Sequence, residues 1–225
     1  MGLGRSAVAL VALAVLGAGC GSGGTISSGP SPASSSPTLA ASSPTPPPSV
    51  PSIAPTTFYS LRFKIPLSFR LAGAWNGVGA DDPNVIFVDA GNPPGVNFAV
   101  SSLVTDPHTG DSSPTPKNLA AWLTANPYLH TDASTHVTLG GVAATRIDAT
   151  ATGAPDSSGA SCGNGCLGLF DFQPGSYSLT QGERAQFYVL HVDGHQLLVA
   201  LDDQASDFDR FLPQAKAMLA SVQFG

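Results

Sequence analysis

The chain has few charged side chains, and its acidic residues outnumber the basic ones. Asp, Glu, Lys and Arg make up 11% of its 225 residues, whereas about a quarter is usual in globular proteins. The formal net charge is −6. An acidic surface repels phosphate groups, so we predict no nucleic-acid partner. It also repels anionic lipid headgroups, and attachment to a membrane would therefore depend on something other than surface charge.

The motifs that usually carry catalysis or ligand binding are also missing. The sequence contains no Gly-x-Ser-x-Gly nucleophile elbow and no phosphate-binding glycine-rich loop after a predicted strand. His191 and His195 flank a predicted two-residue turn, which places them on opposite faces of a hairpin and out of reach of one metal ion. Asp106, His108 and Asp111 share a polar loop, but no glutamate follows at the spacing of a calcium loop. We predict no catalytic residue, no metal site and no cofactor.

One catalytic alternative stays open. The C-terminal half contains four acidic residues that could form a carboxylate pair: Asp171, Glu183, Asp202 and Asp203. Nothing in the sequence places any two of them face to face, and solvation at the surface is the ordinary state of such residues. A cell-envelope hydrolase with an Asp/His site is therefore the alternative function.

The N-terminus has the features of an export signal. Arg5 provides a positive charge, residues 7–16 form an uninterrupted apolar run, and small residues precede Cys20. The run is shorter than the roughly 20 residues that span a bilayer, so residues 1–19 are typical of a cleaved signal peptide. They resemble the signal of bacterial lipoproteins, although Gly17 stands where that family more often has Leu or Val. The resemblance implies a fatty-acylated (palmitate-type) Cys20 and attachment to the extracytoplasmic face of the cell membrane.

Residues 20–56 are expected to form a disordered tether behind the lipidated cysteine. Residues 21–55 contain no charged side chain and consist almost entirely of Ser, Pro, Thr, Gly and Ala. Such a stretch cannot bury enough apolar surface to offset the entropy of ordering. We expect it to hold a folded head, residues 57–225, away from the membrane.

Two cysteines remain for the head, Cys162 and Cys166. Neighbouring cysteines in an exported protein are usually oxidised, and the three residues between them, 163–165, include two glycines that let the sulfur atoms meet. A free dithiol conflicts with the compartment, and a zinc site would need a second pair of ligands. We predict a Cys162–Cys166 disulfide that fixes the geometry of a long loop.

Alternating polar and apolar residues predict several strands in the head. Residues 58–65 show this alternation, and Leu67, Phe69 and Leu71 continue it. The remaining predicted strands are residues 85–88, 96–104, 137–139, 142–152 and 167–172. Residues 105–115 and 173–182 are predicted to be connections. Trp75 and Trp122 are predicted to be core residues rather than ligand platforms.

The strongest hairpin signal is Asp193-Gly194, a dipeptide that favours a two-residue turn between strands. Counting outward from it through residues 185–201 pairs Tyr188 with Val199 on one face and Phe187 with Ala200 on the other. Both faces are apolar away from the turn, so the hairpin is expected inside a sheet that is covered on both sides. This pattern predicts an α+β head in which helices sandwich an antiparallel sheet.

Two helices are predicted to provide these layers. The first begins at Pro116 after a Thr115 cap and ends before Asn126-Pro127. The second runs from a Ser206 or Asp207 cap to about Ser221, and Pro213 is expected to kink or restart it. Residues 222–224 are expected to return as a terminal strand or to pack against the edge of the sheet.

A family resemblance joins these elements. The hydrophobic hairpin, the helix that starts at a proline, and the closing helix with Phe208, Phe211 and Leu212 before residues 218–224 resemble the PsbP-like (Mog/PsbP) α/β/α sandwich. Similar heads follow similar tethers in actinobacterial lipoproteins. The resemblance spans roughly residues 58–225 and implies a binding or accessory role without chemistry. We therefore predict a membrane-anchored lipoprotein whose head binds an envelope protein or an apolar ligand.

Overall fold

The computed structural model describes residues 53–91, 94–153, 165–173 and 175–225. The predicted signal peptide, Cys20, most of the tether and Cys162 lie outside the described residues. The first strand begins at Ile53, earlier than the predicted start of the head at residue 57. Within the described ranges, neither helix has the length and apolar character needed to cross a bilayer.

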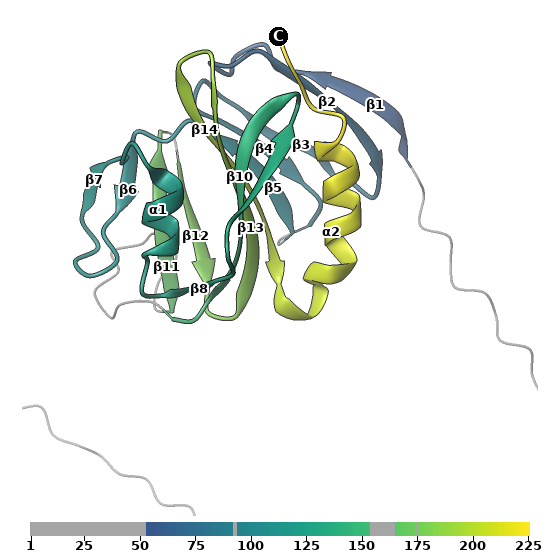
Figure 1. Ribbon diagram of the computed structural model, residues 1–225. Helices are drawn as coiled ribbons and strands as arrows, with labels where there is room; N and C mark the ends of the chain where they lie inside the picture. The colour runs from purple at the N-terminus through teal and green to yellow at the C-terminus, as the bar shows by residue number, and fades with distance from the viewer. Residues whose placement is uncertain (1–52, 92–93, 154–164, 174) are drawn as a thin grey trace, which may run out of the picture. The chain divides into compact units, whose positions relative to one another are not determined.

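Three antiparallel sheets and two helices form the described chain (Figure 1). The central sheet has eight strands, of which β9 pairs only with β10: β3 (Gly77–Asp81), β4 (Val85–Asp89), β5 (Gly95–Ala99), β14 (His195–Gln204), β13 (Glu183–Val192), β10 (Val142–Ala151), β8 (Leu129–Thr131) and β9 (Thr135–Leu139). A three-stranded sheet contains β1 (Ile53–Tyr59), β2 (Leu67–Gly73) and β15 (Gln223–Phe224). A four-stranded sheet contains β12 (Gly175–Thr180), β11 (Cys166–Phe172), β6 (Leu103–Thr105) and β7 (Ser112–Pro114). The helices are α1 (Leu119–Thr124) and α2 (Ala205–Leu219).

The hairpin of β13 and β14 has the predicted register. Tyr188 pairs with Val199 and Phe187 with Ala200. Asp193 and Gly194 both have positive φ angles, 50° and 79°, as the favoured two-residue hairpin turn requires. The two faces of the hairpin enter two separate hydrophobic cores, and this confirms that both sides of the central sheet are covered.

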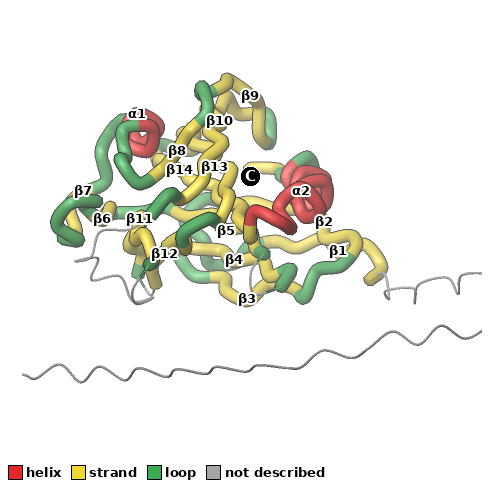
Figure 2. Tube along the Cα trace, turned by 90° about the horizontal axis from the view of Figure 1, so that it is seen from below, coloured by secondary structure: helices red, strands yellow, loops and turns green. Residues whose placement is uncertain are grey.

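The layers on the two faces differ from the predicted helix sandwich. One face packs against α2 together with the sheet of β1, β2 and β15, and the other against α1 together with the four-stranded sheet. Figure 2 shows α2 and β1–β2 on one side of β13, and β6, β7, β11 and β12 on the other. The fold is therefore mostly antiparallel sheet with few helices, and an α/β/α sandwich is not confirmed. Small sheets occupy much of the space that we assigned to helices.

Two predicted connections account for that difference. Residues 173–182 contain β12, and residues 105–115 contain β7. In β12, Tyr177 and Leu179 face the core while Ser176 and Thr180 are exposed. This alternation is typical of a strand with one buried face, but the small polar residues around it are also typical of a loop.

Several element boundaries also differ from the prediction. The first strand ends at Tyr59, because the Ser60 hydroxyl accepts a hydrogen bond from the Phe63 amide at 2.9 Å and the chain turns there. Asn118, not Thr115, caps α1, accepting from the Ala121 amide at 3.0 Å. The second helix starts at Ala205 after Gln204, earlier than the predicted Ser206 or Asp207 cap, and it continues without a break through Pro213. The predicted terminal strand is confirmed as β15, which pairs with β2.

Candidate functional site

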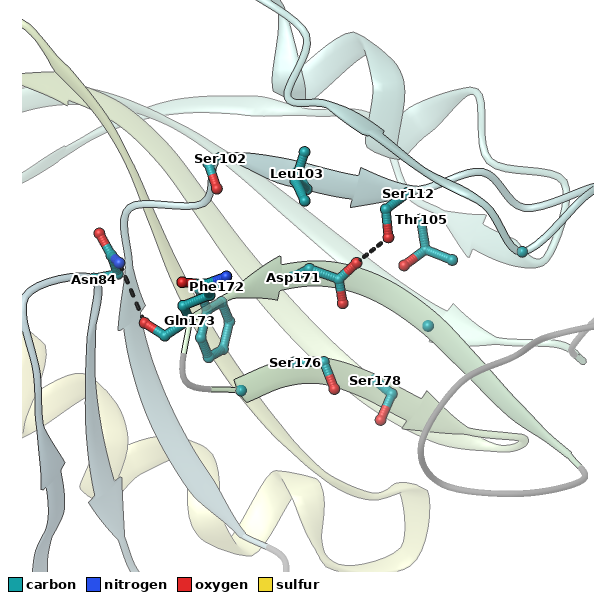
Figure 3. A pocket seen from close by; sticks show the side chains of 13 residues that line it. Asn84, Ser102, Leu103, Thr105, Ser112, Asp171, Phe172, Gln173, Ser176 and Ser178 are labelled. Atoms are coloured by element: carbon teal, nitrogen blue, oxygen red, sulfur yellow. Dashed lines mark hydrogen bonds between the residues drawn. The ribbon is translucent and has the colours of Figure 1, made fainter.

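The outer face of the four-stranded sheet carries a groove lined by small polar side chains. We call it the serine groove; its volume is about 630 Å³. Because Phe170 and Tyr177 point into the core, the residues on the opposite face of β11 and β12 point outward, and register pairs Asp171 with Ser176 and Gly168 with Ser178. Its polar lining includes Ser102, Thr105, Ser112, Asp171, Ser176 and Ser178 (Figure 3).

Two hydrogen bonds tie the strands that form the serine groove. The Ser112 hydroxyl on β7 donates to a carboxylate oxygen of Asp171 on β11 (Figure 3). The Asn84 side-chain amide donates to the Gln173 carbonyl at 3.2 Å and so links the β3–β4 turn to the end of β11. The carboxylate of Asp171 therefore has a neutral hydroxyl as a partner rather than a cation.

A second hollow lies between the β3–β5 end of the central sheet and β12. We call it the Asp202 cleft; its volume is about 490 Å³. Asp202 on β14 is the cross-strand neighbour of Gly95 on β5, and Asn97 is the next residue on that face. Phe87 on β4 pairs with Asn97 and completes this part of the cleft lining.

Two glycines determine the position of the Phe87 ring. A Cβ atom on Gly95 would lie 2.4 Å from the ring, and one on Gly79 would lie 3.1 Å from it. The ring therefore reaches over the backbone of both neighbouring strands, β3 and β5. It remains half-buried and lines the cleft, which gives this polar hollow an aromatic surface.

Asp202 is the electrostatically unusual residue of the cleft. The hydroxyl of Tyr177 on β12 donates to its Oδ1 at 2.9 Å. Burial raises the pKa of Asp202 to about 7, and the negative charges of Glu183 and Asp203 add to the rise, while the hydrogen bond from Tyr177 opposes it. Burial likewise raises the pKa of Tyr177 well above its ordinary value, with the carboxylate of Asp202 as the next cause. Near neutral pH Asp202 is therefore partly protonated, whereas Tyr177 keeps its proton and donates it in the hydrogen bond.

Glu183 also lines the cleft, but both of its oxygens are engaged. The Thr180 amide donates to Oε2 at 2.7 Å, and the Gln204 side-chain amide donates to Oε1 at 2.8 Å. Glu183 is 6% exposed. These contacts close the β12–β13 connection and hold the end of β14, so the local role of Glu183 is to fix the wall of the cleft.

The structure thus brings together acidic residues that the sequence could not place. Asp202 and Glu183 share one cleft, and Asp203 contributes to the raised pKa of Asp202. Asp171 lies in the adjoining serine groove. The five histidines are all exposed, and none lines either hollow. The Asp/His combination of the alternative function is therefore not assembled in these two hollows.

The other residues discussed from the sequence have structural roles. The Asp106 carboxylate accepts from the His108 and Thr109 amides at 2.8 and 3.0 Å, and these bonds lower its pKa. Trp75 is buried against the Phe211 ring, and Trp122 is half-buried beside Phe170. Across the described ranges, no three His, Cys, Asp or Glu residues form a group that could hold a metal ion.

Cys166 is the first residue of β11 and lines the Asp202 cleft. It is 2% exposed. Its predicted partner, Cys162, lies outside the described residues, so the Cys162–Cys166 pairing stays a prediction. A covalent link at this position would fix the start of β11 beside the cleft.

A third hollow of about 700 Å³ lies on the other side of the central sheet. It is formed by the β9–β10 hairpin, the end of α2 and β15. Its lining includes Val137, Leu139, Leu219, Val222 and Phe224, with Arg146 and Lys216. It shares no lining residue with the serine groove or the Asp202 cleft.

Comparison with known proteins gives similarity of fold only. No family model matches the sequence, and no curated protein matches it either. Some solved structures are similar to this chain, and a PsbP protein is among them. It is cyanobacterial PsbP (CyanoP) from Synechocystis sp. PCC 6803, with 10% identity over 80% of this chain and 99% of that chain and a TM-score of 0.41.

A second similar structure is LpqN, described as involved in cell envelope biogenesis of Mycobacterium tuberculosis. Its identity is 11% over 76% of this chain and 91% of that chain, with a TM-score of 0.39. At this level of similarity no ligand, partner or residue role is transferred from either structure.

Proposed function

We propose that this chain is a lipoprotein anchored through Cys20 to the extracytoplasmic face of the membrane, and that its head binds an envelope ligand without catalysing a reaction. The sequence signals in residues 1–19 and 20–56 support the anchor and the tether. One structural observation supports binding by the head. The serine groove and the Asp202 cleft adjoin around β12 and share Phe172, Gly175, Ser176 and Ser178, so polar groups gather on one extended concave surface.

The arrangement of these polar groups favours binding over hydrolysis. A hydrolase would need a nucleophile or activated water beside a free base. Among the carboxylates described for the two hollows, Glu183 accepts two internal hydrogen bonds and Asp171 accepts one from Ser112. Asp202, whose pKa is about 7, is the one observation that favours the hydrolase alternative. No histidine lines either hollow to act with it.

The anchor is tested by replacing the acylated residue. The Cys20→Ala variant is expected to lose all fatty-acyl label, because the sulfur atom that would carry the acyl group is absent. Cells are labelled with an alkyne fatty acid, and label on the protein is followed after fractionation. Labelled wild type in the membrane fraction and an unlabelled variant are expected. Mature wild-type protein without label, or a variant that still carries label, would contradict the anchor.

The binding surface is tested by filling it. Ser178 lines both hollows, and the Ser178→Phe variant places a ring where they adjoin. Co-sedimentation of the mature chain with purified envelope fragments is expected to weaken by about tenfold or more, equivalent to roughly 1.4 kcal/mol. Ser134 is exposed between β8 and β9, and the Ser134→Phe variant is the matched control that keeps wild-type binding.

The outcomes of this second test separate binding from folding. Thermal unfolding of both variants shows whether the head is intact. A folded Ser178→Phe protein that sediments like wild type would show that the two hollows are not the binding surface. Equal losses in both variants would point to a nonspecific effect of the added ring.

A further inference from the structure

The charges around the two polar hollows restrict what can bind there. Their lining includes carboxyl groups, hydroxyls and side-chain amides, but no Lys, Arg or His side chain. Phosphorylated or carboxylated ligands would meet repulsion without any compensating cation. The ligand is therefore uncharged or positively charged.

The hydrogen-bond partners of the carboxyl groups favour an uncharged ligand. The Asp202 carboxyl is paired with the Tyr177 hydroxyl, Asp171 with the Ser112 hydroxyl, and Glu183 with two amide groups. The remaining carboxylate of the lining, Asp82, lies 3.5 Å from the guanidinium group of Arg62. Their negative charge is already met by internal donors, so a cation is not needed to stabilise them. What remains directed to the solvent is a mixture of hydroxyl and amide groups that both donate and accept. Ligand hydroxyl groups have the same double capacity.

The Phe87 ring adds an apolar surface of the right kind. It is half-buried at the cleft, and its reach over β3 and β5 depends on the missing side chains of Gly79 and Gly95. Asn97 lies directly beside it on β5, and Asp202 follows on β14. An aromatic ring bordered by amide and carboxyl groups can pack against the C–H face of a sugar while its neighbours bond the hydroxyls.

We propose that the serine groove and the Asp202 cleft together bind a neutral glycan chain, with Phe87 as the packing surface for one sugar ring and Asn97 and Asp202 as hydrogen-bond partners beside it. This proposal rests on the proposed binding function and names its ligand class. The shared wall at β12 lets one chain run from the cleft into the groove. Thus the ligand is an oligosaccharide rather than a single sugar.

Direct titration with defined probes tests the glycan. The mature full-length chain with Cys20→Ser is titrated by calorimetry and by saturation-transfer NMR with short neutral oligosaccharides of glucose, galactose, mannose and arabinose. At least one series is expected to bind and to bind more tightly as its length increases. The Phe87→Ala and Asn97→Ala variants are each expected to weaken that binding by about tenfold. The Leu61→Ala variant changes a side chain that is 91% exposed and lines neither hollow, so it should bind like wild type.

Two further probes decide between ligand classes. A lysine-rich peptide that binds in place of every oligosaccharide would overturn the glycan and assign the acidic surface to a cationic protein segment. Failure of all oligosaccharides, with Ser178-dependent binding to envelope fragments retained, would also overturn the glycan but leave the proposed function intact. If the fragments do not bind either, both proposals fail. Asn97→Ala keeps the test valid should Phe87→Ala not fold.

Discussion

Replacing Asp202 by asparagine is expected to remove most of the loss of stability that the wild-type chain shows between about pH 4 and pH 7. Asparagine resembles the protonated carboxyl group in shape, and its Oδ1 can still accept from the Tyr177 hydroxyl. The variant should therefore be more stable than wild type above neutral pH. At pH values below about 4, the two proteins should be equally stable.

The direction of this pH dependence follows from the pKa of the Asp202 carboxyl group in the folded and the unfolded chain. In the unfolded chain Asp202 loses its proton near its ordinary pKa of 3.8, whereas in the folded chain it keeps the proton up to about pH 7. The folded state thus binds more protons across this window, so the free energy of unfolding falls as the pH rises. A rise of roughly three pKa units corresponds to on the order of 4 kcal/mol. Above about pH 7, the pKa of Asp202 in the folded chain, the free energy of unfolding is lower by this full amount.

Urea unfolding at several pH values measures this effect. The slope of unfolding free energy against pH should be clearly negative for wild type and much less negative for Asp202→Asn between about pH 4 and 7. A smaller slope remains because burial also raises the pKa of Asp203. Asp132 is exposed between β8 and β9, and the Asp132→Asn variant is the control that should retain the wild-type slope. Identical slopes in wild type and Asp202→Asn would show that burial does not shift this group as the structure indicates.

The Phe187→Ala variant is expected to lose about 3–5 kcal/mol of unfolding free energy. Phe187 is fully buried at the centre of β13. Its ring meets Phe170 edge-on at 6.3 Å and Tyr177 edge-on at 6.2 Å. These two rings belong to β11 and β12, so this aromatic cluster holds the four-stranded sheet on the central sheet. Removing it leaves a cavity beneath the groove-bearing sheet.

Denaturant unfolding of Phe187→Ala and of matched variants measures this loss of unfolding free energy. Tyr59 is 66% exposed, and Tyr59→Ala should change stability by less than about 0.5 kcal/mol. Should Phe187→Ala fail to fold, Phe187→Leu fills part of the cavity and should show a smaller loss in the same direction. If Phe187→Ala lost less than about 1 kcal/mol of unfolding free energy, the aromatic cluster would not be what holds the four-stranded sheet on the central sheet. Envelope binding should fall with stability in the affected variants.

The parts of the fold that the sequence predicted best are governed by local rules. The turn at Asp193-Gly194 needs two positive φ angles, and once it is placed the pairing of Phe187 with Ala200 follows by counting. The apolar character of both faces correctly implied two covering layers. It could not say what those layers contain, because a helix and a small sheet both bury an apolar surface.

The candidate site was beyond prediction for a different reason. Phe87 and Asn97 come from the consecutive strands β4 and β5, but Asp202 comes from β14, far later in the chain, and joins them only through the order of the central sheet. Strand order depends on long-range pairing, which a single sequence does not encode locally. A usable signal was present in β12, where Ser176 and Ser178 alternate with Tyr177 and Leu179. Recognising that strand would have indicated a polar outer face.

The position of β1 has a mechanical consequence for a head held at Cys20 as proposed. β1 is an edge strand that pairs only with β2 in the three-stranded sheet, and Pro55, Thr56, Thr57 and Tyr59 are all exposed. Tension on the tether would therefore act first on β1. If the seven residues of β1 separate from β2, the extended chain between the membrane and the head becomes roughly 20 Å longer. β2 remains held by β15 and α2, so the ligand-facing side of the head does not change.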